Sequence, residues 1–262
     1  MKALMLAAGV GRRLYGDEND ELPKALLRFD GESLLARHIK FLVELGVDEL
    51  VMVVGHRKED LLAEAMSVAP PDFIRPIENP RYKEGPVISL SLGESVLKNG
   101  DSVVFMDADV LYHPVVLERL IRSEHRTCFI VDRDFEPGEE PVKLCIRDGL
   151  VVDFGKQVSE PYDTVGEWPG FFKMAPEIAA RIADSALAYV ARNEVEGAYE
   201  NSMCDVLKSE PPGTFGYEDV TGLPWIEIDF PSDLIRAERI ILPRVSEPLI
   251  DMNVDLSKAE RN

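Results

Sequence analysis

The sequence contains few cysteines, few positive charges and no long apolar run. Its 262 residues include three scattered cysteines, whose number and spacing fit neither a disulfide framework nor a metal site. We therefore expect a cytoplasmic protein in a reducing environment. No apolar run approaches the roughly 20 residues that a membrane span needs. The apolar N-terminus precedes its arginines, which is the reverse of the order in a secretory signal.

Positive charge is scarce: the sequence has 29 Lys and Arg but 48 Asp and Glu, which gives a net charge of −19 at pH 7. Nucleic acids and anionic membranes would repel such a chain, so we expect neither as a partner. Hydrophobic residues make up 45% of the sequence, a fraction typical of globular proteins. The length allows one large domain or two small ones.

Apolar strands and amphipathic helices alternate through the first half of the chain. Strands are predicted at 2–6, 50–54, 73–77, 102–106 and 127–131, and helices at 33–45, 58–66, 87–97 and 114–122. This alternation indicates an α/β fold, with a Rossmann-like, mainly parallel sheet and helices on both faces. Ligands of such sheets bind at the carboxyl ends of the strands.

The pattern changes after about residue 133, where short strands joined by turns are followed by further helices. Strands are predicted at 142–146, 150–154, 170–174 and 225–228, and helices at 176–189, 200–209 and 231–241. We expect a single domain over 1–242, in which residues from about 133 to 242 form a smaller β/α insertion. Residues 243–262 are then a C-terminal tail, either loose or docked on a partner subunit in a homodimer.

A glycine-rich turn follows the first strand. It reads Leu6-Ala7-Ala8-Gly9-Val10-Gly11-Arg12-Arg13-Leu14, and Pro23-Lys24 comes soon after. The turn lacks the third glycine of the dinucleotide fingerprint and the Gly-Lys-Ser/Thr of the P-loop. Its backbone N–H groups and nearby cations suit a triphosphate, because arginine offers a bidentate fork and lysine a point charge. Alternatively, the glycines only turn the chain and the cations are solvated.

Acidic residues end two predicted strands. Asp107 and Asp109 share a face if the extended chain continues past 106, and Asp229 closes the strand at 225–228. Carboxylate oxygens are the ligands that Mg²⁺ prefers. The alternative is that these residues cap local turns, and Asp229 could cap the helix that begins at Pro231.

The glycine string and Pro23-Lys24-Ala25-Leu26 resemble the signature of nucleotidyltransferases that make nucleotide-sugars and CDP-alcohols. The sequence is most similar to bacterial cytidylyltransferases acting on choline phosphate, phosphonates or inositol phosphate, over about residues 1–240. Shorter matching pieces occur in the expected order: Glu78-Asn79-Pro80-Arg81-Tyr82, Ser89-Leu90, Asp107-Ala108-Asp109, Lys156, Gly166-Glu167-Trp168, Tyr199-Glu200-Asn201 and Ile226-Glu227-Ile228-Asp229.

This resemblance implies transfer of CMP from CTP to a small phosphorylated or phosphonylated alcohol, with release of pyrophosphate. It implies a nucleotide-binding half over about 1–132 and an acceptor-binding half over about 133–242. Mg²⁺ would be held by Asp109 and Asp229, with Asp107 or Glu227 assisting through water. The catalytic residues would be Arg13, Lys24 and Lys156. The nucleotide-binding residues would be Leu6, Ala7, Ala8, Gly9, Gly11, Arg12, Asn79, Gly85, Ser89 and Asp107.

The acceptor-binding residues implied by the resemblance are Glu167, Trp168, Tyr199 and Glu200. Carboxylates with aromatic faces suit a cationic head, although each aromatic side chain also suits ordinary core packing. Lys156 would contact the acceptor phosphate or the α-phosphate, unless it is a surface lysine. Two alternatives stay open: a sugar-1-phosphate nucleotidylyltransferase that uses UTP or another nucleotide, and a nucleotide-sensing domain without turnover.

Overall fold

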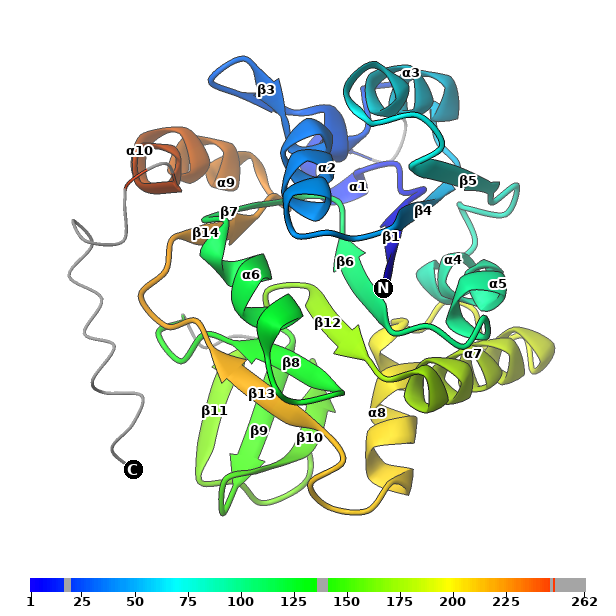
Figure 1. Cartoon of the computed structure of the whole chain (residues 1–262), viewed down its shortest axis with the longest axis vertical. Helices are drawn as coiled ribbons and strands as arrows, with labels where there is room; N and C mark the ends of the chain where they lie inside the picture. The colour runs from blue at the N-terminus through cyan, green and yellow to red at the C-terminus, as the bar shows by residue number, and fades with distance from the viewer. Residues whose placement is uncertain (17–19, 136–140, 246, 248–262) are drawn as a thin grey trace.

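A seven-stranded sheet forms the centre of the chain in the computed structural model, which describes residues 1–16, 20–135, 141–245 and 247 (Figure 1). The strand order is β13-β8-β12-β6-β1-β4-β5. Neighbouring strands run parallel except β12, which is antiparallel to both β6 and β8. The strands are β1 (Lys2–Ala7), β4 (Glu49–Val54), β5 (Ile74–Glu78), β6 (Val103–Asp107), β8 (Cys128–Val131), β12 (Phe171–Met174) and β13 (Gly216–Asp219). The predicted mainly parallel α/β sheet is confirmed.

Both faces of this sheet are covered, which explains why its central strands are continuously apolar. Neighbouring side chains of β12 point to opposite faces. The Phe171 ring packs edge-on against Tyr112 and His38, the latter on the helix α2 (Leu34–Glu44). The Phe172 ring stacks on Phe129 with centroids 4.1 Å apart, within the core between the sheet and the second half of the chain.

Most of the remaining helices lie close to their predicted positions, although the short helical segments at 12–15 and 24–26 were not predicted. Ser33 caps α2, because its Oγ accepts a hydrogen bond from the backbone N–H of Ala36 at 3.0 Å. The helix predicted over 87–97 is divided into two at Gly93. The helices are α1 (Arg12–Tyr15), α3 (Lys58–Val68), α4 (Pro86–Leu92), α5 (Glu94–Leu97), α6 (Val115–Arg122), α7 (Pro176–Ala191) and α8 (Glu200–Ser209), with a 3₁₀ turn η1 (Lys24–Leu26).

Three small sheets complete the fold. The strands β9 (Lys143–Arg147), β10 (Leu150–Gly155) and β11 (Thr164–Glu167) form an antiparallel sheet that lies next to β8 and β13 (Figure 1). Strands β2 (Arg28–Phe29) and β3 (Glu32–Ser33) pair with each other, as do β7 (Val110–Tyr112) and β14 (Trp225–Glu227). Five strands were not predicted from the sequence: β2, β3, β7, β11 and β13. Each has two to four residues, too few for a periodic pattern.

Helical structure continues past the predicted end of the domain at residue 242. The helix α9 (Pro231–Arg236) leads into a π-helical turn, η2 (Ala237–Ile241), and then into α10 (Leu242–Val245). Val245 is buried in a second core cluster with Ile241 and Leu111. The rest of the predicted tail, apart from residue 247, lies outside the described residues, so its docking in a homodimer stays a prediction. Within the described part of the chain, no helix combines the length and hydrophobicity needed to cross a membrane.

Candidate functional site

A cavity of about 470 Å³ opens at the carboxyl ends of β1 and β6. Nearly all of the predicted site residues line it. They are Leu6, Ala7, Ala8, Gly9, Gly11, Arg12, Arg13, Lys24, Gly85, Ser89, Asp107, Asp109, Lys156, Trp168, Tyr199, Glu200 and Asp229. The two halves of the chain therefore meet around one cavity, where the sequence predicted that the ligands of such a sheet bind.

The glycine turn forms one wall of this cavity because it leaves the end of β1 and leads into α1. Gly11 adopts a φ of +69°, a conformation that glycine accepts without strain, and a Cβ there would lie 3.0 Å from the Tyr15 ring. The backbone N–H of His56 donates to the carbonyl of Ala8 at 3.2 Å and ties the turn to the end of β4.

Lys24 lies at the centre of the charged part of the cavity. Its ammonium donates to Oδ2 of Asp109 at 3.0 Å and to Oδ1 of Asp229 at 2.6 Å. The guanidinium of Arg13 contacts the same Oδ1 of Asp229 at 2.8 Å. Burial alone would lower the pKa of Lys24, but the carboxylates of Asp109 and Asp229 raise it, so the side chain stays an ammonium ion.

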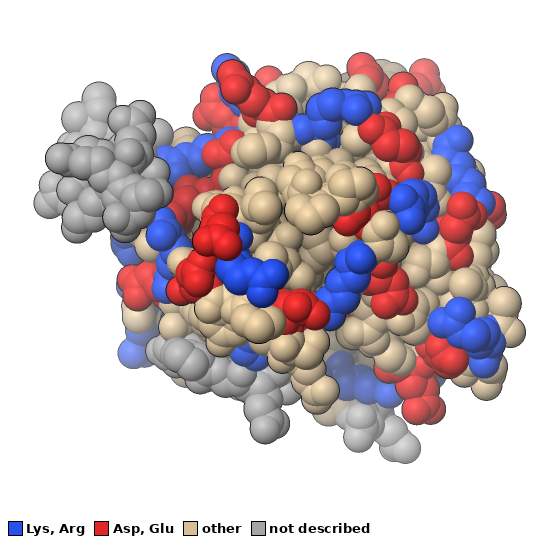
Figure 2. Space-filling view, turned by 90° about the horizontal axis from the view of Figure 1, so that it is seen from below, with Lys and Arg blue, Asp and Glu red and all other residues tan. Residues whose placement is uncertain are grey.

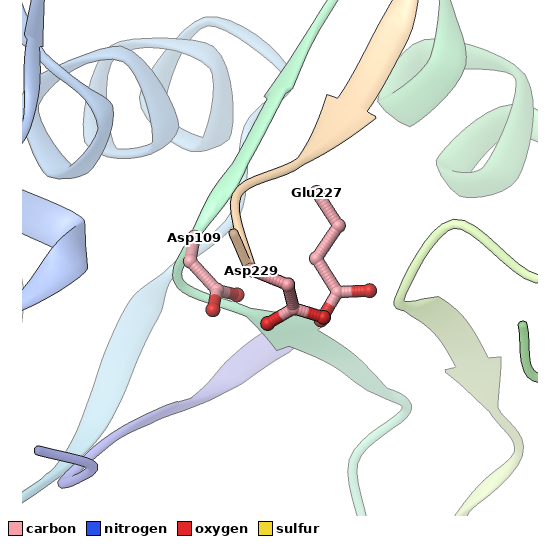
Figure 3. Close-up of side chains that lie close together, drawn as sticks. All are labelled: Asp109, Glu227 and Asp229. Carbon is pink, nitrogen blue, oxygen red and sulfur yellow. The ribbon is translucent and has the colours of Figure 1, made fainter. Parts of the chain in front are cut away.

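The ribbon of β7 and β14 brings these two distant aspartates together. Asp109 comes directly before β7, and Asp229 comes two residues after β14, so the antiparallel pairing places both at the same end of the ribbon. The backbone N–H of Ile228 donates to the carbonyl of Asp109 at 3.0 Å and extends this pairing to the aspartates. Figure 3 shows the two carboxylates pointing into the same space, with Glu227 beside them.

Asp109, Glu227 and Asp229 form the acidic cluster of the site. Each offers one oxygen, and these oxygens lie within 4.8 Å of one another. Burial, followed by the charges of Asp109 and Asp229, raises the pKa of Glu227 well above its ordinary value. The expected proximity of Asp109 and Asp229 is therefore present in the structure, and the cluster offers the oxygen donors that a hard divalent cation prefers.

Asp233, and not Asp229, makes the side-chain hydrogen bonds at the start of the helix α9. Asp233 Oδ2 accepts the backbone N–H groups of Asp229 and Phe230, at 2.9 and 2.7 Å, at the start of α9. The carboxylate of Asp229 instead faces Lys24 and Arg13. The alternative prediction, that Asp229 only caps this helix, is therefore wrong.

Asp107 and Asp109 do not act as a pair on one strand face. The strand β6 ends at Asp107, and the extended chain resumes only at Val110 in β7, so the condition for a shared face is not met. Asp107 accepts a hydrogen bond from the hydroxyl of Tyr199 at 2.6 Å. Burial and the nearby carboxylate of Asp109 raise the pKa of Asp107 well above its ordinary value, although the bond from Tyr199 lowers it.

The second half of the chain contributes Lys156, Trp168, Tyr199 and Glu200 to the lining of the cavity. Glu200, at the start of α8, is only 8% exposed, and burial raises its pKa against the opposing charges of Lys156 and Arg13. Trp168 is 3% exposed, and its indole N–H already donates to the carbonyl of Phe171 at 2.7 Å. Trp168 can therefore offer ring surface to a ligand but no hydrogen bond.

Asn79 and Glu167 are not among the residues that line the cavity. The Asn79 amide is fully buried, donates to Ser89 Oγ at 2.9 Å and accepts the backbone N–H of Arg81 at 2.8 Å. These contacts order the loop that follows β5, and the role of Asn79 in nucleotide binding stays a prediction. The backbone of Glu167 pairs with Asp132 at the edge of the small sheet.

Gly85 lines the cavity at a point where two loops meet. A Cβ on this residue would lie 1.7 Å from the backbone carbonyl oxygen of Val195, so only glycine permits this approach. The neighbouring Lys83 also lines the cavity and was not predicted. The polar residues immediately before Gly85-Pro86 were the available signal, but one lysine among them does not stand out.

Basic side chains do not gather on the face shown in Figure 2, where they are separated and have acidic neighbours. The cations of the cavity are different, because Arg12, Arg13, Lys24, Lys83 and Lys156 all line one space. The same space is lined by Asp107, Asp109, Glu200, Glu227 and Asp229. A polyanion and a cation could both find partners there.

Known proteins are similar in sequence to this chain. The profile of the MobA-like NTP transferase domain matches residues 3–158. A bifunctional IPC transferase and DIPP synthase of Rubrobacter xylanophilus is 30% identical over 245 residues, which make up 92% of this chain and 52% of that protein. A CMP-5'-(3-aminopropyl)phosphonate synthase of Streptomyces rubellomurinus is 27% identical over 262 residues, 96% of this chain and 40% of that protein. The chain thus spans about half the length of these relatives or less.

A solved structure shares the fold. The inositol-1-phosphate CTP transferase from T. maritima superimposes with a TM-score of 0.73, covering 94% of this chain and 96% of that one at 22% identity. At this level of identity the likeness concerns the arrangement of the sheet and helices.

Proposed function

Because the chain belongs to the MobA-like NTP transferase domain family, we propose that it is a Mg²⁺-dependent cytidylyltransferase. It would transfer CMP from CTP to a small phosphorylated or phosphonylated alcohol and release pyrophosphate. The relatives support this chemistry, since their names include an IPC transferase and a phosphonate CMP synthase. The observation that carries the proposal is the contact of Lys24 with both Asp109 and Asp229 inside the cavity that the glycine turn lines.

The reaction needs positioned charges more than it needs a base. An oxygen of the acceptor phosphate is already an anion, so it can attack the α-phosphorus of CTP without losing a proton. The new bond joins that oxygen to the α-phosphorus. The bond between the α-phosphorus and the oxygen that bridges it to the β-phosphate breaks, and pyrophosphate is the leaving group. Preorganised cations then stabilise the charge that develops, which is the usual form of catalysis in phosphate transfer.

The cations of the cavity have the right types for these roles. Arg13 and Lys24 would hold the phosphates that leave as pyrophosphate, and Lys156, from the second half of the chain, would hold the acceptor phosphate. The glycine turn, with Arg12, Gly85 and the other predicted nucleotide-binding residues, would hold CTP. Tyr199, Glu200 and the ring of Trp168 would contact the rest of the acceptor.

The acidic cluster fits a divalent cation, because three carboxylates offer oxygens within 4.8 Å of one another in a partly buried position. Asp109 and Asp229 would hold Mg²⁺, and Glu227 would support it. Bound Mg²⁺ would neutralise charge on the reacting phosphates. The chain's own contribution is to hold these carboxylates at one end of the β7–β14 ribbon.

A panel of nucleotides and acceptors tests the proposal. Pyrophosphate release is measured with CTP, UTP, ATP or GTP, each combined with phosphocholine, an aminoalkylphosphonate, inositol phosphate or glucose 1-phosphate. We expect release with CTP and one of the first three acceptors. Release only with UTP and glucose 1-phosphate would contradict the proposal and favour a sugar nucleotidylyltransferase. Nucleotide binding without release from any pair would favour a sensing domain.

A further inference from the structure

Lys24 lies directly beside the position that a metal ion on the acidic cluster would take. Its ammonium lies 3.0 Å from Oδ2 of Asp109 and 2.6 Å from Oδ1 of Asp229. Mg²⁺ binds oxygen at 2.0–2.1 Å. An ion on these same two oxygens would therefore lie less than about 5 Å from the ammonium, where a divalent and a monovalent cation repel each other strongly.

The lysine is well held in this position. Its side chain is 12% exposed, and it begins the short turn η1 directly after Pro23. A metal ion that binds alone must therefore break two ion pairs and leave an ammonium without partners in a partly buried site, which is unfavourable.

A nucleotide removes this obstacle, because its triphosphate supplies new oxygens for the ammonium. Lys24 lines the same cavity as the glycine turn, Arg13 and Lys156, so its side chain can reach an anion bound there. When the ammonium moves to the phosphates, together with the guanidinium of Arg13 that contacts the same oxygen of Asp229, Asp109 and Asp229 become available to the metal.

We propose that Lys24 serves as the resident counter-ion of the acidic cluster and makes metal binding depend on the nucleotide. The cluster then takes up a divalent cation only together with a polyphosphate, and each ligand increases the affinity for the other by the same factor. This inference rests on the proposed metal site, but it concerns binding and not turnover.

The test is a titration with Mn²⁺, a spin-active substitute for Mg²⁺, followed by electron paramagnetic resonance on the full chain without substrates. Lys24→Met removes the ammonium. Lys83→Met is the matched control, because Lys83 lines the same cavity and no ion pair joins it to the acidic cluster among the described residues. Both changes remove one positive charge from the cavity. Lys24→Gln is a second neutral variant if Lys24→Met does not fold.

We expect weak Mn²⁺ binding to the unmodified chain, and much tighter binding once CTP is added. Lys24→Met should bind Mn²⁺ without CTP on the order of 10–100-fold more tightly than the unmodified chain, since a repelling charge in direct contact is gone. The effect of CTP on Mn²⁺ affinity should shrink accordingly. Lys83→Met should bind Mn²⁺ nearly as the unmodified chain does.

Equal Mn²⁺ affinity in Lys24→Met and the unmodified chain would overturn the inference and leave the metal site intact. An equal gain in Lys83→Met would also overturn it, because the effect would then come from net charge alone. Absence of Mn²⁺ binding in every variant, with and without CTP, would overturn the proposed metal site as well.

Discussion

Asp229 and Asp233 lie on the same short segment but have different contacts, so the same Asp→Asn change at each separates catalysis from folding. Asp229 contacts Lys24 at 2.6 Å and Arg13 at 2.8 Å. Asp233 accepts two backbone N–H groups at the start of α9. Both substitutions remove one negative charge, and both keep the size and shape of the side chain.

Asp229→Asn should lower turnover on the order of 10²–10³-fold, the range found when one preorganised group of a charged site is lost. Its effect on stability should be small. The variant loses attraction to Lys24 and Arg13. It also loses repulsion from Asp109 and Glu227, each of which has an oxygen within 4.8 Å of an oxygen of Asp229. We expect the free energy of unfolding to change by no more than about 1 kcal/mol.

The assay is pyrophosphate release at saturating CTP and Mg²⁺, together with urea unfolding of both variants. Asp233→Asn should keep turnover close to the original value, because an amide oxygen can still accept the two N–H groups. If Asp229→Asn retains normal turnover, or if both variants lose it equally, the acidic cluster does not take part in the reaction.

Three other substitutions or conditions test neighbouring parts of the structure. Burial lowers the pKa of His38 to about 4; the stability that its neutral form contributes is complete above pH 6.5 and falls by about 3 kcal/mol between pH 6.5 and 4. Urea unfolding across this range should show that fall, and a variant His38→Asn should show less of it. Tyr199→Phe leaves Asp107 without its donor at 2.6 Å and should lower the free energy of unfolding by about 1–3 kcal/mol, whereas an unchanged value would mean that water replaces the hydroxyl. Gly85→Ala places a Cβ 1.7 Å from the carbonyl oxygen of Val195, so it should destabilise the chain by about 1–3 kcal/mol and weaken CTP binding in calorimetry; normal values of both would show that the two loops separate freely.

The main sheet could be predicted because its strands are buried on both faces and are therefore continuously apolar. The strands at 50–54 and 102–106 agree with β4 and β6 to within one residue at each end. The strand at 225–228 was predicted and agrees with β14, but the three-residue strand β7 was missed. Their pairing could not be predicted in this way, since it joins positions more than one hundred residues apart. This pairing depends on tertiary packing and leaves no local pattern.

The candidate site also combines features that local sequence predicts with contacts that it does not predict. The glycine turn and its cations stand together in the sequence, so their common location at one cavity wall was predictable. The contact of Lys24 with both aspartates was not, because an ion pair across 205 positions has no signature in spacing. The shared face expected for Asp107 and Asp109 was wrong for a related reason. The chain leaves the extended conformation after Asp107, whose carboxylate accepts a hydrogen bond from the distant Tyr199, and the local strand pattern shows neither feature.

The fate of the individual phosphates of CTP tests the central claim most directly. Samples of CTP labelled with ³²P at the α or the γ position are incubated with Mg²⁺ and the acceptor that supports pyrophosphate release. Attack at the α-phosphorus predicts that the α label appears in a product joined to the acceptor, while the γ label appears in pyrophosphate. Transfer of the γ label to the acceptor, or its appearance as orthophosphate without any product that carries the α label, would contradict nucleotidyl transfer.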